Sequence, residues 1–214
     1  MQKNASLSLS KLIFSALTGA FMVLAFFSCA QNSAGISAID AAVIFDYADE
    51  TSLPSVTLSV FVQPTYDAER VASVSIEHLE SGYTWTQNTP QIIPARNAKS
   101  WAGYRNFCPV QGQELPIGKY ECRCTDAASE TASAAFVVTY PQELLSLSQS
   151  QAETFLKSTA VTRFTALYDS DGVLIYFGDE DFDISKYATA RTKRTVLSCY
   201  EGTLQCMLSR ENLH

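Results

Sequence analysis

Alternation of apolar and polar residues, the pattern of a half-buried β-strand, dominates the middle of the chain. Between Ser55 and Gln63 every second residue is valine or leucine and most of the others are polar, so a strand here has one apolar face. Runs of the same kind occupy residues 41–47, 71–79, 83–87, 100–107, 119–125 and 133–140. About seven short strands within about 100 residues, separated by turn-rich pieces, predict an antiparallel β-sandwich over residues 39–140.

The strand pattern stops at Pro141, and a region with a different order of elements follows. Residues 141–150 are expected to be a linker, in which Ser148 is the N-cap of a short helix over 149–157. Strands are then predicted at residues 163–168, 173–177, 195–201 and 204–209. The turn at 169–172 has hairpin composition, and Gly202-Thr203 suits a type II′ turn. Residues 151–214 therefore form a predicted small α+β module, either independent or packed on the sandwich.

The N-terminus has the organisation of a secretory signal peptide. Residues 1–28 contain Lys3 and Lys11 and no acidic residue, and the run from Leu12 to Phe27 is almost entirely apolar. A permanent transmembrane anchor would need about 20 apolar residues, and this run is shorter. We therefore expect residues 1–28 to be removed on export.

The end of that run, Leu24-Ala-Phe-Phe-Ser-Cys29, resembles the lipobox of bacterial lipoproteins. Phe26 departs from the usual leucine, and the departure is similar to the looser pattern of spirochaetal lipoproteins. The resemblance implies that Cys29 carries a diacylglycerol thioether and that the chain is exported and anchored to a membrane, on its periplasmic face or at the cell surface. Each buried acyl CH2 contributes about 0.8 kcal/mol, so two or three chains hold a protein stably. Residues 29–38 are expected to be a flexible tether.

A second resemblance concerns Leu115-Pro-Ile-Gly-Lys-Tyr-Glu-Cys-Arg-Cys-Thr-Asp126, which is similar to the F strand of immunoglobulin-like and fibronectin type III-like domains. It implies that Tyr120 is a corner tyrosine whose hydroxyl bonds to a nearby backbone group, and that Trp85 is the core tryptophan. The expected fold is thus mainly β, an immunoglobulin-like antiparallel sandwich followed by the α+β module. The B-like strand contains no cysteine, so the disulfide typical of antibody domains is absent from the pattern.

Five cysteines remain after Cys29 is assigned to lipid, and an exported chain favours disulfides. Two disulfides and one free thiol are predicted. Cys199 and Cys206 face each other if Gly202-Thr203 is the turn, whereas a turn at Glu201-Gly202 would place them diagonally and disfavour a bond. Either Cys122 or Cys124 can bond to Cys108 across a loop. We predict a bond between Cys108 and Cys122, which leaves Cys124 as the free thiol. A redox pair or a zinc site is disfavoured at this spacing.

Acidic residues gather in the C-terminal region and form the one candidate metal site. Calcium prefers six to eight oxygen ligands, but the spacing is not that of an EF-hand loop, so a solvated turn is the alternative interpretation. The candidate ligands are Asp169, Asp171, Asp179, Asp181 and Asp183. The basic run Arg191–Arg194 is expected at the surface or at a protected strand edge.

An aromatic-rich band lies in the second half of the predicted sandwich. If exposed, these rings would bind sugar or peptide, and the alternative is that they pack in the core. The candidate binding residues are Tyr83, Trp85, Trp101 and Tyr104, with Phe107 beside them.

Charge and motifs narrow the classes of function. A net charge of -7 argues against a protein that mainly grips nucleic acid. His78 and His214 are the only histidines, and no nucleophile elbow, phosphate loop or metalloprotease motif is present. The expected function is a membrane-anchored binding or structural lipoprotein with a protein partner, no cofactor and no enzymatic activity. The alternatives are a carbohydrate-active or hydrolytic module using the C-terminal carboxylates, and a carrier of a small ligand or metal.

Overall fold

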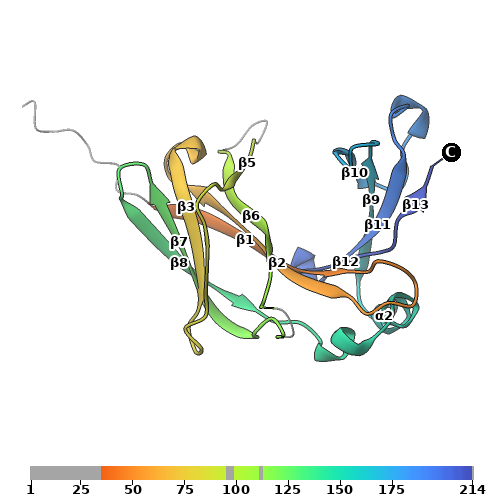
Figure 1. The fold of residues 1–214 in the computed structure, drawn as a ribbon, viewed down its shortest axis with the longest axis horizontal. Coiled ribbons are helices and arrows are strands. Elements are labelled where there is room, and N and C mark those ends of the chain that lie inside the picture. Colours follow the sequence, from red (N-terminus) through yellow and green to blue (C-terminus); the bar gives the residue numbers. More distant parts are fainter. Residues whose placement is uncertain (1–34, 95–98, 111–112, 214) are drawn as a thin grey trace, which may run out of the picture. The chain divides into compact units, whose positions relative to one another are not determined.

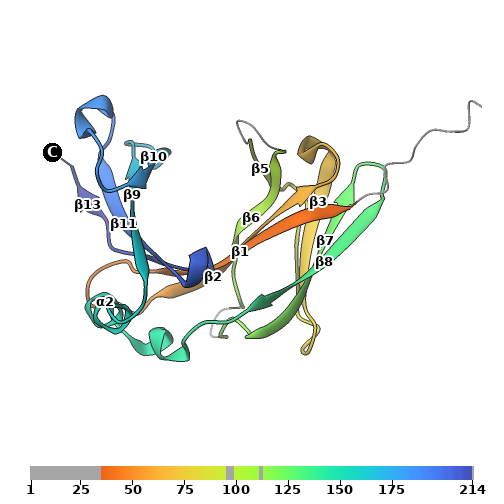
Figure 2. The same cartoon turned by 180° about the vertical axis from the view of Figure 1, so that it is seen from behind.

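The computed structural model of the chain describes residues 35–94, 99–110 and 113–213 and is mainly β. Its strands form one four-stranded and one nine-stranded sheet (Figures 1 and 2). Side chains from both sheets meet in one buried cluster, as in a β-sandwich. The prediction of a mainly β fold with two sheets is confirmed.

The four-stranded sheet has the order β4-β3-β7-β8 and is antiparallel throughout. Its strands are β3 (Val71–His78), β4 (Thr84–Gln87), β7 (Gly118–Asp126) and β8 (Thr131–Val138). In the register, Ile76 of β3 lies opposite both Trp85 of β4 and Cys122 of β7. The alternate residues of each strand therefore point the same way and bury an apolar face.

The first half of the nine-stranded sheet has the order β1-β2-β6-β5, again antiparallel. Its strands are β1 (Ile36–Asp46), β2 (Ser55–Pro64), β5 (Gln91–Ile93) and β6 (Trp101–Phe107). The alternation in β2 predicts its buried face correctly, since Leu58, Val60 and Val62 are fully buried. At Gly103 in β6 an added Cβ would lie 2.1 Å from the carbonyl oxygen of Val60, so only glycine lets these strands pair here.

The second half of this sheet is built from the C-terminal strands. They are β9 (Val161–Tyr168), β10 (Leu174–Asp179), β11 (Thr192–Cys199), β12 (Leu204–Met207) and β13 (Glu211–Asn212). β12 pairs in parallel with β1, and the order continues through β11 and β9 to β10, while β13 pairs with β11. The strands of the predicted α+β module therefore continue the nine-stranded sheet beyond β1 through backbone hydrogen bonds.

The α-helix of the described residues is α2 (Gln149–Leu156), capped as predicted by Ser148. The backbone N–H of Ser148 donates to Oε1 of Gln151 at 3.0 Å, and Ala152 and Leu156 are buried. Short 3-10 helices lie at Ala68–Arg70 (η1), Gln142–Ser146 (η2), Ile184–Lys186 (η3) and Tyr200–Gly202 (η4).

Two predicted connections are more ordered than expected. β1 begins at Ile36, so the last three residues of the predicted tether belong to a strand. The predicted linker contains η2, whose Leu144 is fully buried in the core. Composition does not predict either feature. Backbone pairing orders the end of the tether, and the buried side chain of Leu144 orders the linker.

The predicted corner bond forms at the start of β7. The hydroxyl of Tyr120 donates to the carbonyl of Pro116 at 2.6 Å, and its ring is fully buried. The hydroxyl of Tyr140 donates in the same way to the carbonyl of Leu115 at 2.6 Å. Two tyrosines therefore hold the segment before β7 against the core, and burial raises the pKa of both.

Candidate interaction surface

The hairpin β9–β10 is held at its turn by a single carboxylate. Oδ1 of Asp169 accepts from the backbone N–H groups of Asp171 and Val173, each at 2.9 Å. Gly172 has a φ of 76°, the left-handed region that favours glycine. The predicted hairpin is confirmed, and its second strand becomes the last strand of the nine-stranded sheet.

Apolar side chains are exposed along this last strand and beside it. Val173 is 56% exposed and Phe177 is 52% exposed, and Leu174 and Ile184 are also exposed. The ring of Phe177 stacks on Phe164 of β9, with centroids 5.3 Å apart. Exposed apolar groups that gather at one place mark interaction surfaces more often than isolated ones do.

The other face of β10 carries a cluster of three aromatic rings. Tyr176 packs against Phe182 at 4.7 Å and Tyr187 at 4.9 Å between centroids. Its hydroxyl donates to the carbonyl of Asp179 at 3.1 Å, and an added Cβ on Gly178 would lie 2.6 Å from that hydroxyl oxygen. Desolvation and the neighbouring Tyr187 and Asp179 raise the pKa of Tyr176. This cluster holds the segment after β10 close to the strand.

The predicted metal site does not form. Within the described residues no group of three or more His, Cys, Asp or Glu side chains is placed to hold a metal ion. The six-residue strand β10, about 20 Å long, separates Asp169 and Asp171 from the later acids. Asp169 caps the hairpin turn, and Asp183 caps η3 by accepting from the N–H of Ser185 at 3.1 Å. The other three candidates, Asp171, Asp179 and Asp181, are exposed, as in the solvated-turn interpretation.

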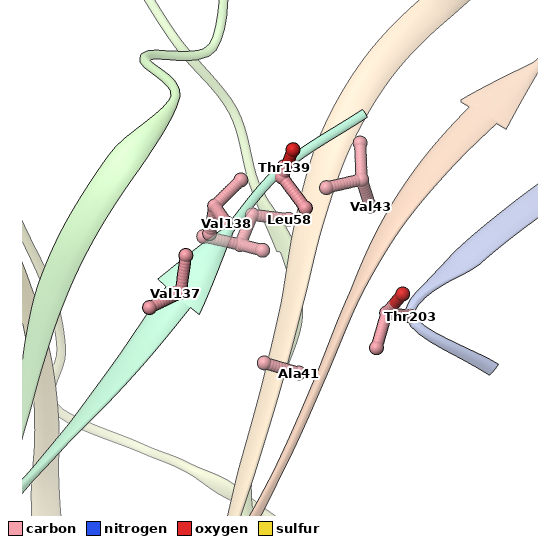
Figure 3. Close-up of a pocket in the computed structure, with 7 residues that line it drawn as sticks. All are labelled: Ala41, Val43, Leu58, Val137, Val138, Thr139 and Thr203. Carbon is pink, nitrogen blue, oxygen red and sulfur yellow. The ribbon is translucent and has the colours of Figure 1, made fainter. Parts of the chain in front are cut away.

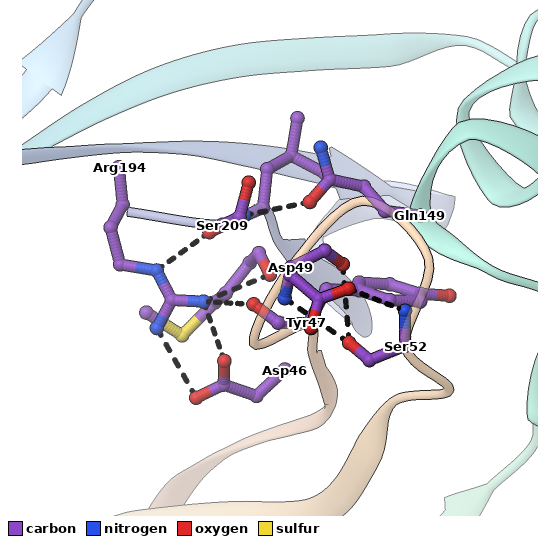
Figure 4. A network of polar contacts seen from close by, with 9 residues as sticks. Asp46, Tyr47, Asp49, Ser52, Gln149, Arg194 and Ser209 are labelled. Atoms are coloured by element: carbon purple, nitrogen blue, oxygen red, sulfur yellow. Dashed lines mark hydrogen bonds and ion pairs between the residues drawn. The ribbon is translucent and has the colours of Figure 1, made fainter. Parts of the chain in front are cut away.

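A buried arginine joins the C-terminal strands to β1 (Figure 4). Arg194 is 4% exposed and β11 lies between β9 and β12, so the prediction that it lies at the surface or at a strand edge is wrong. Its guanidinium forms a two-point ion pair with Asp46 at 2.5 and 3.2 Å. It also donates to the carbonyls of Leu208 at 2.7 Å and of Tyr47 and Met207 at 3.1 Å each. Arginine suits this position because its planar fork serves several acceptors at once.

A polar cavity of about 350 Å³ lies at this joint. Its lining residues are Asp46, Tyr47, Ala48, Ser55, Arg194 and Arg210. The Arg194 guanidinium already serves one carboxylate and three carbonyls, which leaves one N–H of Nη1 without an acceptor among the described residues. Nearby, Oε1 of Gln149 accepts from the N–H of Ser209 at 2.8 Å and ties α2 to the same corner. We interpret the cavity as part of a structural joint.

The small apolar cavity between the sheets is also unsuited to a ligand (Figure 3). Its volume is about 50 Å³, whereas ligand pockets usually measure about 300–1,000 Å³. The side chains around it are Ala41, Val43, Leu58, Val137, Val138, Thr139 and Thr203.

The four aromatic residues predicted to bind ligand do not share one surface. Trp85 packs against Tyr83 at 4.4 Å and against Tyr120 at 6.4 Å, and its Nε1 donates to the carbonyl of Cys108 at 2.5 Å. Tyr104 packs against the buried Phe107. Trp101 precedes the buried Ala102 in β6 and so points to the opposite face of that sheet. The alternative interpretation, core packing, describes Trp85 and Tyr104, which both contact the main cluster.

None of the five cysteines in the described residues is in a disulfide. Cys199 lies opposite Leu204, and Cys206 lies opposite Leu197, so the two thiols are diagonal, as the alternative turn predicted. The connection is a four-residue loop in which Tyr200, Glu201 and Gly202 have positive φ, rather than a type II′ turn.

The structure also has no bond between Cys108 and Cys122, and the first thiol is exposed whereas the second is buried. Cys124 is free like the other four, and it is buried. Burial raises the pKa of Cys122 and Cys206 to about 12, which disfavours their reactive thiolates.

Comparison of the chain with protein-family models, with curated proteins and with solved structures found no match. Among the helices of the described residues, none has the length and apolar character to cross a membrane. The candidate lipid-attachment residue, Cys29, lies outside the described residues.

Sequence reasoning missed the exposed edge as a functional surface. A signal was present, because Val173-Leu-Ile-Tyr-Phe177 is an unbroken apolar run rather than an alternating one. A strand that is apolar on both faces is expected inside a sheet, whereas β10 lies at its end.

Proposed function

We propose that the chain is an exported, lipid-anchored protein that acts by binding another protein, without catalysing a reaction, through the edge of the β9–β10 hairpin. The observation that carries this proposal is the exposure of Val173, Leu174, Phe177 and Ile184 around a strand at the end of a sheet. An exposed strand edge is a template for pairing with another chain, and exposed aromatic residues act as anchors in protein interfaces.

An immunoglobulin-like identity for the sandwich is part of the proposal. The strand orders β1-β2-β6-β5 and β4-β3-β7-β8 correspond to orders A-B-E-D and C′-C-F-G of such domains. The Tyr120 hydroxyl bond, two residues before Cys122, further supports the assignment. In this assignment Trp85 lies on the C′ strand rather than on C.

Membrane anchoring rests on the sequence before the first strand. The run ending at Ser28-Cys29 supports cleavage and lipidation, and β1 begins at Ile36. Detergent phase partitioning tests this part: wild type is expected in the detergent phase, and Cys29→Ala, if it is still exported, in the aqueous phase. Equal partitioning of the two into the aqueous phase would refute lipidation.

Site-specific photo-crosslinking tests the binding part. A photoreactive phenylalanine analogue replaces Phe177 in the full chain within its own membrane, and the matched control carries it at Ser133, an exposed position of β8. A discrete crosslinked partner is expected at position 177 and not at 133. Equal products at both positions, or none at 177, would refute the proposed surface.

A further inference from the structure

We infer that the partner contributes an extended segment with basic residues, which adds as a further strand to the free edge of β10. This inference deepens the proposed function and rests on it. Of the described strands β10 pairs only with β9, so one side of its backbone has no strand partner. Addition of a strand to such an edge supplies main-chain hydrogen bonds, and the flanking side chains supply specificity.

The free edge of β10 is regular over its second half and has few of the features that usually prevent an edge strand from pairing with another chain. The register with β9 shifts between Leu174 and Tyr176, and from Tyr176 to Asp179 the pairing is continuous. Natural edge strands are commonly protected by lysine, proline or bulges. β10 contains no lysine, arginine or proline, and its one irregularity lies before the continuous part.

The two faces of β10 offer different contacts to an added strand. On one face the exposed Phe177 stacks on the half-buried Phe164, and Tyr176 with its cluster lies on the other face. Successive residues of an added strand point to alternate faces. Apolar residues of the partner would therefore contact Phe177 on one face and Tyr176 on the other.

Charge identifies the kind of segment that fits. Asp171 lies before β10, and Asp179, Glu180 and Asp181 lie at its end and beyond, all of them exposed. None of the ion pairs among the described residues includes any of these four. Acidic groups at both ends of an apolar edge favour a partner with lysine or arginine flanking its apolar residues.

The same charges argue against a second copy of this chain as the occupant. An antiparallel β10–β10 pair would place Asp171 of one copy near Asp179 and Glu180 of the other, at both ends of the pair. A parallel pair would place each acid beside its own counterpart. Both arrangements bring like charges together, which suppresses association.

The test uses three synthetic ten-residue peptides with one alternating apolar core and flanking lysine, threonine or glutamate. Affinity for the purified full chain is measured by fluorescence anisotropy at 50 and 200 mM salt. The lysine peptide is expected to bind at least tenfold more tightly than the glutamate peptide. Its affinity is expected to be lower at 200 mM than at 50 mM salt, because salt screens exposed charges. Methylation of its alternate backbone nitrogens is expected to reduce binding at least tenfold, since the ladder bonds are lost.

The charge contribution is tested on the protein side with two matched triple variants. The first variant combines Asp179→Asn, Glu180→Gln and Asp181→Asn. Its affinity for the lysine peptide is expected to be about tenfold lower, which is the loss expected when three exposed ion pairs are removed. The control removes exposed acids elsewhere, with Glu50→Gln, Glu69→Gln and Glu130→Gln, and is expected to leave affinity within about twofold.

Three results would overturn the inference. They are equal affinity for the three peptides, absence of binding, and a concentration-dependent dimer of the unliganded chain through β10. If position 177 still crosslinks to a partner in those cases, the proposed function stands and only the chemistry assigned to the partner fails.

Discussion

Replacing Arg194 with methionine is expected to lower the free energy of unfolding by about 3 kcal/mol, because the arginine is the buried connection between β11 and the end of β1. The substitution keeps an unbranched chain of similar length and removes the guanidinium. The guanidinium of Arg194 donates to three carbonyls. One of them, the carbonyl of Met207, also accepts from the N–H of Tyr47 at 3.0 Å. The carbonyls of Tyr47 and Leu208 have no second donor among the described residues.

The magnitude follows from these partners. A buried carbonyl left without a donor costs about 1–3 kcal/mol, and we take the low end for each of the two because a loop can admit water. The ion pair adds at most about 1 kcal/mol, since the side chain of Asp46 is 39% exposed and its charge is screened by solvent. Asp46→Asn, which removes only the ion pair, is therefore expected to cost about 1 kcal/mol or less.

Urea unfolding followed by tryptophan fluorescence measures both variants, with Trp85 and Trp101 as reporters. Amide exchange at β12 supplies a local readout, because the arginine holds this strand to β1. The free energy of unfolding of Arg194→Lys is expected to lie between those of the two other variants, since one ammonium group cannot replace all the donors of the planar guanidinium. If Arg194→Met costs no more than Asp46→Asn, the carbonyl contacts do not stabilise the joint and the reasoning fails.

Three further predictions concern the core. Tyr47→Phe is expected to raise the free energy of unfolding by about 1 kcal/mol in urea titration, because the buried hydroxyl has no hydrogen-bond partner among the described residues; a loss of stability would contradict this. Gly103→Ala is expected to destabilise by more than about 2 kcal/mol or to prevent folding, as circular dichroism melting would show, because its Cβ would clash with a neighbouring carbonyl; an unchanged melting temperature would refute it. Stability is expected to fall as the pH rises above about 9, because the unfolded chain ionises the thiols of Cys122 and Cys206 there, whereas burial raises their pKa to about 12 in the folded state. Urea titrations from pH 7 to 10.5 should show a shallower loss for Cys122→Ala than for wild type, and parallel curves would refute the burial argument.

The strands of the sandwich were predictable because their signal is local. The alternation in β2 and the Gly-x-Tyr pattern before Tyr120 each reflect a side chain that faces the core or a nearby carbonyl. The capping residue Ser148 was equally readable, since its partner is three residues away. Neighbouring residues supply the physical cause in each case, and the sequence carries that information directly.

Two of the features that were missed depend on residues far apart in the sequence, and a third depends on the conformation of one short loop. The parallel pairing of β1 with β12 joins segments about 160 residues apart, for which alternation carries no information. Arg194 is buried because Asp46 and three carbonyls surround it, whereas its sequence neighbours suggest a solvated basic run. The thiols of Cys199 and Cys206 are diagonal because Tyr200 and Glu201 adopt positive φ, which propensity does not anticipate for these residues.

Binding of the partner through the free edge of β10 is tested by the affinity of a Phe177→Ser variant. Once the partner crosslinked at position 177 is identified, its dissociation constant is measured by calorimetry for wild type, for Phe177→Ser and for Val137→Ser, which removes an apolar group exposed on β8. Phe177→Ser is expected to bind the partner at least tenfold more weakly than wild type, and Val137→Ser is expected to bind it equally well. Equal affinities for wild type and Phe177→Ser would contradict binding through this edge.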